Sequence, residues 1–330
     1  MQVTVLGGGS WGTTVASLLA ARNDTMIWAR NPAVAGEINE QRTNGGYLPG
    51  FELHRKLRAT ADLEQAVRHA ELLIVGVPTS AVRATMVEAG AWTHPWIPIV
   101  TLSKGLEQKT LLRMTQVVAD VIPGHPVAAL TGPNIAREIM AGQAAAAVVA
   151  TEDLAVAAAI QGVLTRGLFR VYINHDVIGC ELGGALKNVV AIASGIAQGL
   201  GVGDNTRSAV MTRGLAELTR LGVAMGGEAP TFAGLAGMGD LITTCISPHS
   251  RNRHVGEQLG RGRKLAEILG EMNMVAEGVK TATTARQLAK RHGVEMPVCE
   301  EIYQVVNGRT SAGRAYRGLS VRPGHESDPG

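Results

Sequence analysis

The stretch Val3-Thr4-Val5-Leu6-Gly7-Gly8-Gly9-Ser10-Trp11-Gly12 decides the fold that this sequence predicts. A short β-branched, apolar run is followed at once by a G-x-G-x-x-G turn, and the turn leads into a helical run that we expect over Thr13 to Arg22. Strand, glycine turn and helix start stand here in the order that a dinucleotide-binding fold requires. A turn that only shapes the backbone is the alternative, but the context on both sides favours a dinucleotide site.

Each glycine of this turn has its own role in the predicted site. Gly7 allows the tight turn, Gly9 lets the backbone approach a pyrophosphate, and Gly12 permits close packing of the helix on the strand. The unpaired amides at the helix start and the positive end of the helix dipole then face the anion.

The end of the second predicted strand bears on the choice of dinucleotide. Thr25 to Ala29 has the composition of a buried strand, and Arg30 follows it. An NAD site usually carries Asp or Glu about 20 residues after the glycine turn, whereas an arginine there suits the 2′-phosphate of NADP. Arg30 therefore favours NADP, with NAD also possible, and a solvated strand-end arginine is the alternative.

Alternating strand and helix patterns continue to about Asp176. We expect further strands at Leu72–Val75, Ile97–Thr101, Val127–Thr131, Ala145–Ala150 and Phe169–Asn174. This alternation predicts a doubly wound parallel sheet. The turn-rich loop over 42–58 either closes over a nucleotide or covers a sheet edge.

Helical patterns dominate the rest of the chain, and no convincing strand intervenes. The predicted fold class is thus α/β, with a Rossmann-type dinucleotide-binding domain over residues 1–176 and an all-helical substrate domain over 177–320. The polar residues 321–330, with proline and glycine, predict a disordered tail.

Composition excludes several classes of partner. The net charge is +3, and the aromatic residues, 3% of the 330, do not interleave with basic ones, so no nucleic acid is predicted. No apolar run reaches about 18 residues and the chain begins directly with a strand, so neither membrane insertion nor a secretory leader is predicted.

The cysteines and histidines predict no metal site. Cys180, Cys245 and Cys299 are far apart and odd in number, which favours a reducing, cytoplasmic compartment, and the nine histidines show no ligand spacing. Cys245 has no base at a suitable spacing, so we interpret it as a packed thiol.

One lysine and one asparagine, Lys187 and Asn188, interrupt the small and apolar helical run from Gly183 to Ala193. Burial disfavours the charged ammonium and lowers its pKa, which makes the amine useful as a proton carrier near neutrality. The alternative is a lysine that snorkels from the helix edge.

Other polar residues suit a phosphorylated substrate. His249 to Arg253 is expected to open a helix with hydroxyl, guanidinium and amide donors, which suits a phosphate monoester; a basic helix cap without a ligand is the alternative. Lys104 follows a predicted strand, where it either neutralises phosphate or polarises a carbonyl, or is an ordinary surface lysine.

Together these motifs resemble those of bacterial NAD(P)-dependent glycerol-3-phosphate dehydrogenases. The motifs that carry the resemblance are the glycine turn with Ser10-Trp11, Leu102–Gly105, Gly132-Pro133, Gly184–Asn188, Gly203–Asn205, Gly234–Leu241 and Ser250–Asn252. The resemblance runs from Met1 to about Gly308. It implies the two domains above, a homodimer, and reversible reduction of dihydroxyacetone phosphate to sn-glycerol 3-phosphate for phospholipid synthesis.

The resemblance also implies roles for individual residues. Lys187 is similar to the family's proton donor and acceptor at the substrate oxygen, and Lys104, Asp240 and Thr244 match its catalytic neighbours. The implied substrate contacts are Lys104, Gly132, Asn134, Lys187, Asn188, Asp240, Ser250, Arg251 and Asn252. The cofactor contacts expected from the turn and the resemblance are Gly7, Gly9, Ser10, Trp11, Gly12, Arg30, Lys104, Ala136, Arg251, Val275 and Glu277. Asn134 departs from the hydroxyl residue that the family usually has, so its own contact stays open.

Two other functions are compatible with part of the pattern. A related dehydrogenase for a 3-hydroxy acid or a sugar acid has no use for a phosphate pocket at Arg251 and Asn252. A non-catalytic NADP-binding sensor can dispense with Lys187 and Asp240.

Overall fold

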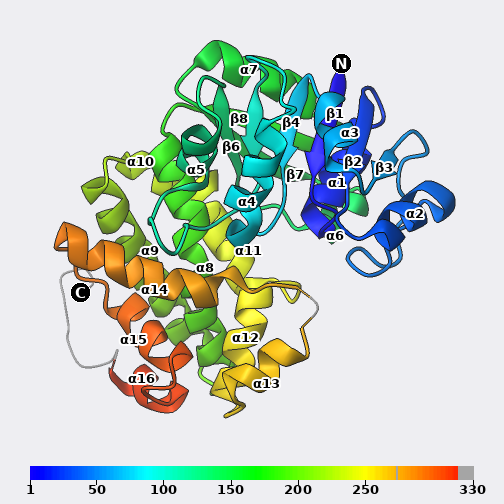
Figure 1. The fold of residues 1–330 in the computed structure, drawn as a ribbon. Coiled ribbons are helices and arrows are strands. Elements are labelled where there is room, and N and C mark those ends of the chain that lie inside the picture. Colours follow the sequence, from blue (N-terminus) through cyan, green and yellow to red (C-terminus); the bar gives the residue numbers. More distant parts are fainter. Residues whose placement is uncertain (273, 319–330) are drawn as a thin grey trace. The chain divides into compact units, whose positions relative to one another are not determined.

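The computed structural model describes residues 1–272 and 274–318, and the predicted tail over 321–330 lies outside the described residues. The chain folds as two units, each with its own hydrophobic core (Figure 1). The first unit consists of Met1–Ser103 and Met114–Val177, and the second of Lys104–Arg113 and the described residues from Ile178 onward. The sequence does not indicate that Lys104–Arg113 belongs with the helical unit.

An eight-stranded sheet in the order β3-β2-β1-β4-β5-β6-β7-β8 forms the first unit. Its strands are β1 (Gln2–Leu6), β2 (Asp24–Trp28), β3 (Arg58–Thr60), β4 (Leu72–Val75), β5 (Ile99–Thr101), β6 (Val127–Thr131), β7 (Ala145–Ala150) and β8 (Phe169–Asn174). The strands from β3 to β6 pair in parallel. Chain order reverses between β1 and β4, which is the switch point where such sheets bind ligands.

The last two strands differ from the prediction. β7 and β8 are parallel to each other, but β7 is antiparallel to β6, so the prediction of an entirely parallel sheet is wrong at this edge. The helix between β6 and β7, α6 (Ala136–Met140), has five residues and spans about 7.5 Å, whereas returning along the five residues of β6 takes about 16 Å. The chain therefore re-enters the sheet from the edge at which β6 ends.

The helices of the first unit lie on both faces of the sheet. Besides α6 they are α1 (Ser10–Leu19), α2 (Pro32–Gln41), α3 (Leu63–Arg68), α4 (Thr79–Gly90), α5 (Met114–Val121) and α7 (Leu154–Leu164). α1 contacts α6, while α4 contacts α3 and α5. α1 begins at Ser10, earlier than predicted, because Gly9 of the glycine turn is already its N-cap residue. β3 was not predicted, because its three residues directly follow the turn-rich loop.

Apart from the segment Lys104–Arg113, which contains no helix, the described part of the second unit is built of helices. Its elements are α8 (Val177–Gly199), α9 (Asp204–Ala224), α10 (Ala229–Ala233), the π-helix η1 (Leu235–Gly239), α11 (Asp240–Ile246), α12 (Arg251–Gly260), α13 (Leu265–Gly270), α14 (Glu277–His292), α15 (Pro297–Val306) and α16 (Ala312–Gly318) (Figure 1). The helical character that the sequence predicts for this part of the chain is confirmed.

Helix α8 is the core of this unit. By length and composition it is the one helix among the described residues that could span a membrane, but 89% of its most apolar window is buried inside the protein. A Cβ atom on Gly195 would lie 2.1 Å from the backbone oxygen of Arg253, so α8 and α12 pack backbone against backbone there. These properties are those of a buried core helix.

Candidate active site

Lys187 lies near the middle of α8 with only 5% of its surface exposed, so the alternative of a snorkelling lysine is wrong. Its Nζ donates to a carboxylate oxygen of Asp240 and, at 2.6 Å, to Thr244 Oγ1. Burial lowers the pKa of Lys187 to about 8; the Asp240 carboxylate opposes this shift and the Lys104 ammonium adds to it. The amine can therefore exchange a proton near neutral pH.

Asp240 joins this lysine to a second one. Its other carboxylate oxygen lies 2.7 Å from Lys104 Nζ, and the Asp240 side chain is 2% exposed. Thr244 Oγ1 donates to the Asp240 backbone oxygen at 2.6 Å, which leaves the hydroxyl oxygen to accept from Lys187. One buried carboxylate thus contacts two ammonium groups, and the four predicted catalytic residues form a single hydrogen-bonded group within the second unit.

The π-helix η1 leads directly into Asp240. A Cβ atom on Gly237 would lie 2.1 Å from the backbone oxygen of Phe232, so this segment folds tightly back on the end of α10. Single π-helical turns occur frequently at functional sites. Here the turn delivers Asp240 to the first position of α11, and Thr244 follows it on the same helix face four residues later.

A chain of amides lies beside Lys187 on the same unit. Asn252 Nδ2 donates to Asn188 Oδ1 at 2.9 Å, and Asn252 Oδ1 accepts from the Gly278 amide, also at 2.9 Å. Ser250 caps α12, since its Oγ accepts from the Arg253 amide at 3.2 Å. Three of the predicted substrate contacts are therefore buried and held in fixed positions.

Arg251 and Arg253 have opposite environments although both lie in the first turn of α12. Arg253 is buried and donates to the Ser247 backbone oxygen and to Gln198, so its guanidinium serves the fold. Arg251 is exposed. Its guanidinium interacts electrostatically with Glu277 at the start of α14, and an arginine stays charged in proteins. Val275, the other late cofactor contact predicted, precedes α14 and is 38% exposed.

In the first unit, the glycine turn has the geometry that the sequence predicts. Gly7 has a φ of +127°, and a Cβ atom there would lie 2.7 Å from the carbonyl carbon of Gly76, at the end of β4. A Cβ atom on Gly12 would lie 2.1 Å from the Gly7 oxygen. Ser10 and Trp11 are the first residues of α1. Arg30 is exposed two residues beyond the end of β2.

Buried polar atoms that fit a polar ligand lie in the first turn of α1, at the end of β6 and in the loop that follows β6. Trp11 Nε1, Thr131 Oγ1 and Asn134 Oδ1 are buried and have no hydrogen-bond partner among the described residues. Asn134 donates from Nδ2 to the Ala146 backbone oxygen at 3.0 Å, which directs Oδ1 elsewhere as an acceptor. Gly132 lies in the same loop and Ala136 begins α6. A dinucleotide carries both donors and acceptors, so these residues fit it.

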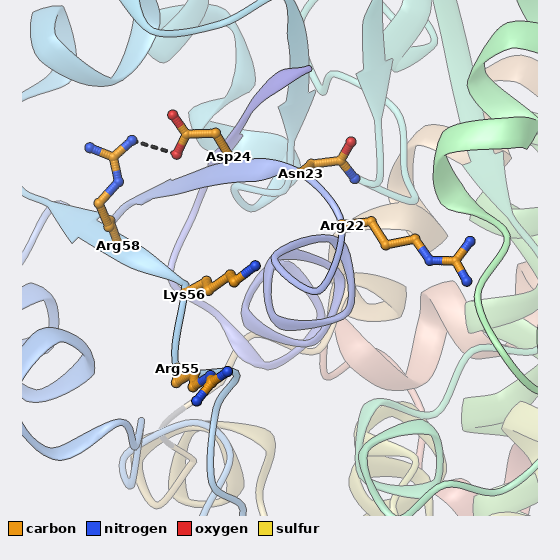
Figure 2. Close-up of a pocket in the computed structure, with 6 residues that line it drawn as sticks. All are labelled: Arg22, Asn23, Asp24, Arg55, Lys56 and Arg58. Atoms are coloured by element: carbon orange, nitrogen blue, oxygen red, sulfur yellow. Dashed lines mark hydrogen bonds and ion pairs between the residues drawn. The ribbon is translucent and has the colours of Figure 1, made fainter.

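A recess of about 560 Å³ lies elsewhere on the first unit, around the start of β2 (Figure 2). Its lining residues are Arg22, Asn23, Asp24, Arg55, Lys56 and Arg58. Asp24 begins β2 whereas the glycine turn follows the end of the parallel strand β1, so the recess and the turn lie at opposite edges of the sheet. Arg58 pairs with Asp24 at 2.6 Å, and in Figure 2 the side chains of Arg22 and Lys56 do not converge. No predicted site residue lines this recess.

The three cysteine side chains lie inside the protein. Cys180, Cys245 and Cys299 are buried and free of disulfide bonds. Burial raises the pKa of Cys245 to about 12, which confirms the interpretation of a packed thiol. In the part of the chain that the structure describes, no cluster of three His, Cys, Asp or Glu side chains could hold a metal ion.

Comparison with known proteins identifies the family. Residues 2–157 match the family described as NAD-dependent glycerol-3-phosphate dehydrogenase N-terminus, and residues 176–317 match NAD-dependent glycerol-3-phosphate dehydrogenase C-terminus. The chain belongs to the NAD-dependent glycerol-3-phosphate dehydrogenase family. Membership confirms the resemblance read from the motifs and the prediction of an NAD(P)-dependent oxidoreductase.

Relatives in this family match over almost their whole length. Glycerol-3-phosphate dehydrogenase (NAD(P)+) 2 of Sphingopyxis alaskensis is 53% identical and covers 100% of this chain and 99% of its own. Glycerol-3-phosphate dehydrogenase (NAD(P)+) of Mycobacterium avium is 50% identical, and the match covers 98% of this chain and 96% of that protein. The crystal structure of glycerol-3-phosphate dehydrogenase from Coxiella burnetii superimposes with a TM-score of 0.92 at 32% identity, with 97% and 98% covered. The Rossmann-type and helical arrangement is therefore confirmed as well.

Proposed function

We propose that this enzyme catalyses the reversible reduction of dihydroxyacetone phosphate to sn-glycerol 3-phosphate with NADPH or NADH. The observation that carries the proposal is the buried group of Lys187, Asp240, Thr244 and Lys104 in a member of this family. Relatives at about half identity bear the name of this activity.

Lys187 supplies the proton. When bound, the nicotinamide supplies a hydride to the ketone carbon in reduction or accepts one in oxidation. In reduction, protonated Lys187 donates a proton to the substrate oxygen as its negative charge develops, and in oxidation neutral Lys187 takes that proton back. Lys104 makes protonated Lys187 a stronger acid. After Lys187 has donated its proton, the Asp240 carboxylate is still paired with the Lys104 ammonium, so loss of the Lys187 charge costs less.

The residues around the start of α12 hold the substrate phosphate in this proposal. Arg251 is exposed and cationic at the first helical position, where the amides and dipole of a ten-residue helix favour an anion. Asn252 and Asn188 are already bonded to each other, so little ordering entropy is lost when they receive the substrate. This charged site discriminates against substrates that carry no phosphate.

The glycine turn and the loop after β6 hold the dinucleotide in this proposal. The amides and the positive dipole end at the start of α1 receive the pyrophosphate, and Trp11 Nε1 and Asn134 Oδ1 are available for further hydrogen bonds. Arg30 receives the 2′-phosphate, so we propose that NADP is preferred and NAD is also used. A cytoplasmic location is part of this proposal, because three widely spaced cysteines are typical of a reducing compartment. That the enzyme forms a homodimer, and that its product supplies phospholipid synthesis, both remain predictions.

Loss of NADPH absorbance with dihydroxyacetone phosphate tests the function. We expect turnover with dihydroxyacetone phosphate and hardly any with unphosphorylated dihydroxyacetone or with a keto acid. Lack of turnover with both NADPH and NADH contradicts the proposal. Faster reduction of a keto acid instead supports the related dehydrogenase for a 3-hydroxy acid. The role in phospholipid synthesis is tested by complementation: the cloned gene should allow a glycerol 3-phosphate auxotroph to grow without added glycerol 3-phosphate.

A further inference from the structure

Asn44 is a buried asparagine in the loop between α2 and β3. It has 0% exposure although the loop around it is polar and rich in glycine. Its Nδ2 donates to two groups next to predicted cofactor contacts, the Gly8 backbone oxygen at 2.9 Å and Thr13 Oγ1 at 2.8 Å. The side chain therefore joins the loop to the glycine turn and to the first turns of α1.

The loop is fixed on both sides of Asn44. Glu37, on α2, accepts from Thr43 Oγ1 at 2.8 Å and from the Gly45 amide at 2.6 Å through the same carboxylate oxygen. The Asn44 backbone oxygen accepts from the Tyr47 and Leu48 amides. Because its neighbours are held, the Asn44 amide group is presented to the turn in one orientation.

The bond to the Gly8 oxygen controls the direction of the next amide. The carbonyl of Gly8 and the N–H of Gly9 belong to one planar, trans peptide group, so they point in opposite directions. No described residue accepts a hydrogen bond from the Gly9 amide, and a Cβ atom on Gly9 would have no atom within 4 Å. Holding the Gly8 oxygen towards Asn44 thus directs the Gly9 N–H away from Asn44, to the other side of the peptide.

We propose that Asn44 is a positioning residue for the cofactor, which orients the Gly8–Gly9 peptide so that the Gly9 N–H is directed at the pyrophosphate. The inference rests on the proposed function, because it takes the glycine turn as the dinucleotide site. Two successive glycines leave this peptide free to rotate, and a donor that is already oriented binds an anion without that ordering cost. Asn44 acts through the backbone and does not touch the pyrophosphate.

The dissociation constant of NADPH, measured by titration calorimetry in the full-length protein, tests this role. In Asn44→Ala we expect binding to weaken roughly ten- to a hundredfold, the range for one hydrogen bond to a charged group. At saturating NADPH, kcat and the KM for dihydroxyacetone phosphate stay within about threefold of wild type, because the second unit is unchanged.

Asn39→Ala is the matched control. Asn39 exchanges two hydrogen bonds with Ala59, both at 2.8 Å, and so joins α2 to β3 without contacting the glycine turn. We expect its dissociation constant for NADPH to stay within about twofold of wild type. If NADPH binding weakened equally in both variants, the loss would be due to general loosening of this region, and the proposal would be overturned.

Thr13→Val supplies a second test if Asn44→Ala fails to fold. Valine has the shape of threonine but removes the second acceptor of Asn44, so we expect roughly two- to fivefold weaker NADPH binding. Unchanged affinity in the folded variants overturns the role of Asn44. If wild-type protein binds neither NADPH nor NADH, the proposed function itself fails, and the two failures are thereby distinguished.

Discussion

Replacing Asp240 with asparagine shifts the pH dependence of ketone reduction in a direction that the structure predicts. The Asp240 carboxylate bonds both Lys187 and Lys104, and it raises the pKa of Lys187 against the effect of burial. An opposite charge at such a distance shifts a pKa by about 1 to 3 units. From a value of about 8, the pKa of Lys187 should therefore fall to roughly 5 to 7 in Asp240→Asn.

The sign of the effect on rate follows from the role of Lys187 as an acid. Reduction requires its protonated form, so kcat in the wild type should be level below pH 8 or so and fall about tenfold per unit above it. In Asp240→Asn the fall should begin about 1 to 3 units lower. The assay is steady-state kcat for dihydroxyacetone phosphate, followed by NADPH absorbance between about pH 5.5 and 10. The pH at which kcat begins to fall, the high-pH limb of the profile, is read separately from any loss in the maximal rate.

Lys104→Met gives a shift of opposite sign in the same assay. Lys104 lowers the pKa of Lys187, so its removal should move the high-pH limb upward by about one unit. A structural disturbance has no reason to shift the two variants in opposite directions. Limbs that stay in place, or that move the same way in both variants, would refute the assignment of the proton to Lys187.

Four further substitutions have defined outcomes. Lys187→Ala should lower kcat by several orders of magnitude and leave the calorimetric Kd for NADPH nearly unchanged; comparable turnover would remove this lysine from proton transfer. Arg251→Ala should weaken substrate binding by about 1.5 to 3 kcal/mol, measured through KM, and an unchanged KM would count against the phosphate assignment. Arg30→Ala should raise the Kd for NADPH more than that for NADH, whereas equal changes would contradict the preference for NADP. Glu217 is fully buried, and burial raises its pKa from the ordinary 4.5 to about 7. Between these two pH values the native state therefore binds one more proton than the unfolded state. The free energy of unfolding should fall by about 3 kcal/mol as the pH rises through this range. Urea unfolding of Glu217→Gln should lack this decline, and an identical pH dependence in both proteins would contradict it.

The site residues that could be predicted from the sequence are those whose environment is local. The glycines of the first turn are required by backbone geometry within a few residues, as the positive φ of Gly7 shows. Lys187 was interpreted as buried, with a snorkelling lysine as the alternative, because its helical run is small and apolar apart from Asn188; its low exposure confirms burial. Ser250 was expected to open a helix from the residues that follow it, and it does.

The features that could not be predicted depend on distant parts of the chain. The direction of β7 is set by how far α6 can carry the backbone, and the alternation of strand and helix patterns does not give the direction of a strand. Asn44 looks like an ordinary turn residue among Thr43, Gly45 and Gly46, and its role depends on a contact made 36 positions away. Lys104 was singled out because it follows a predicted strand of the first unit. Its ion pair is with Asp240, far along the chain in the second unit.

The segment Lys104–Arg113 has a practical consequence for dividing this protein into parts. The segment closes on itself through a bridge between Leu106 and Arg113, places Leu106 in the helical core, and is tied to α8 by the ion pair from Arg113 to Glu181. A fragment that begins at Ile178 would lack a piece of its own hydrophobic interior as well as one of the two cations at Asp240. Splitting the gene at the residue where the long helix begins would therefore leave the helical half incomplete, and a self-sufficient helical fragment would need these ten residues grafted back.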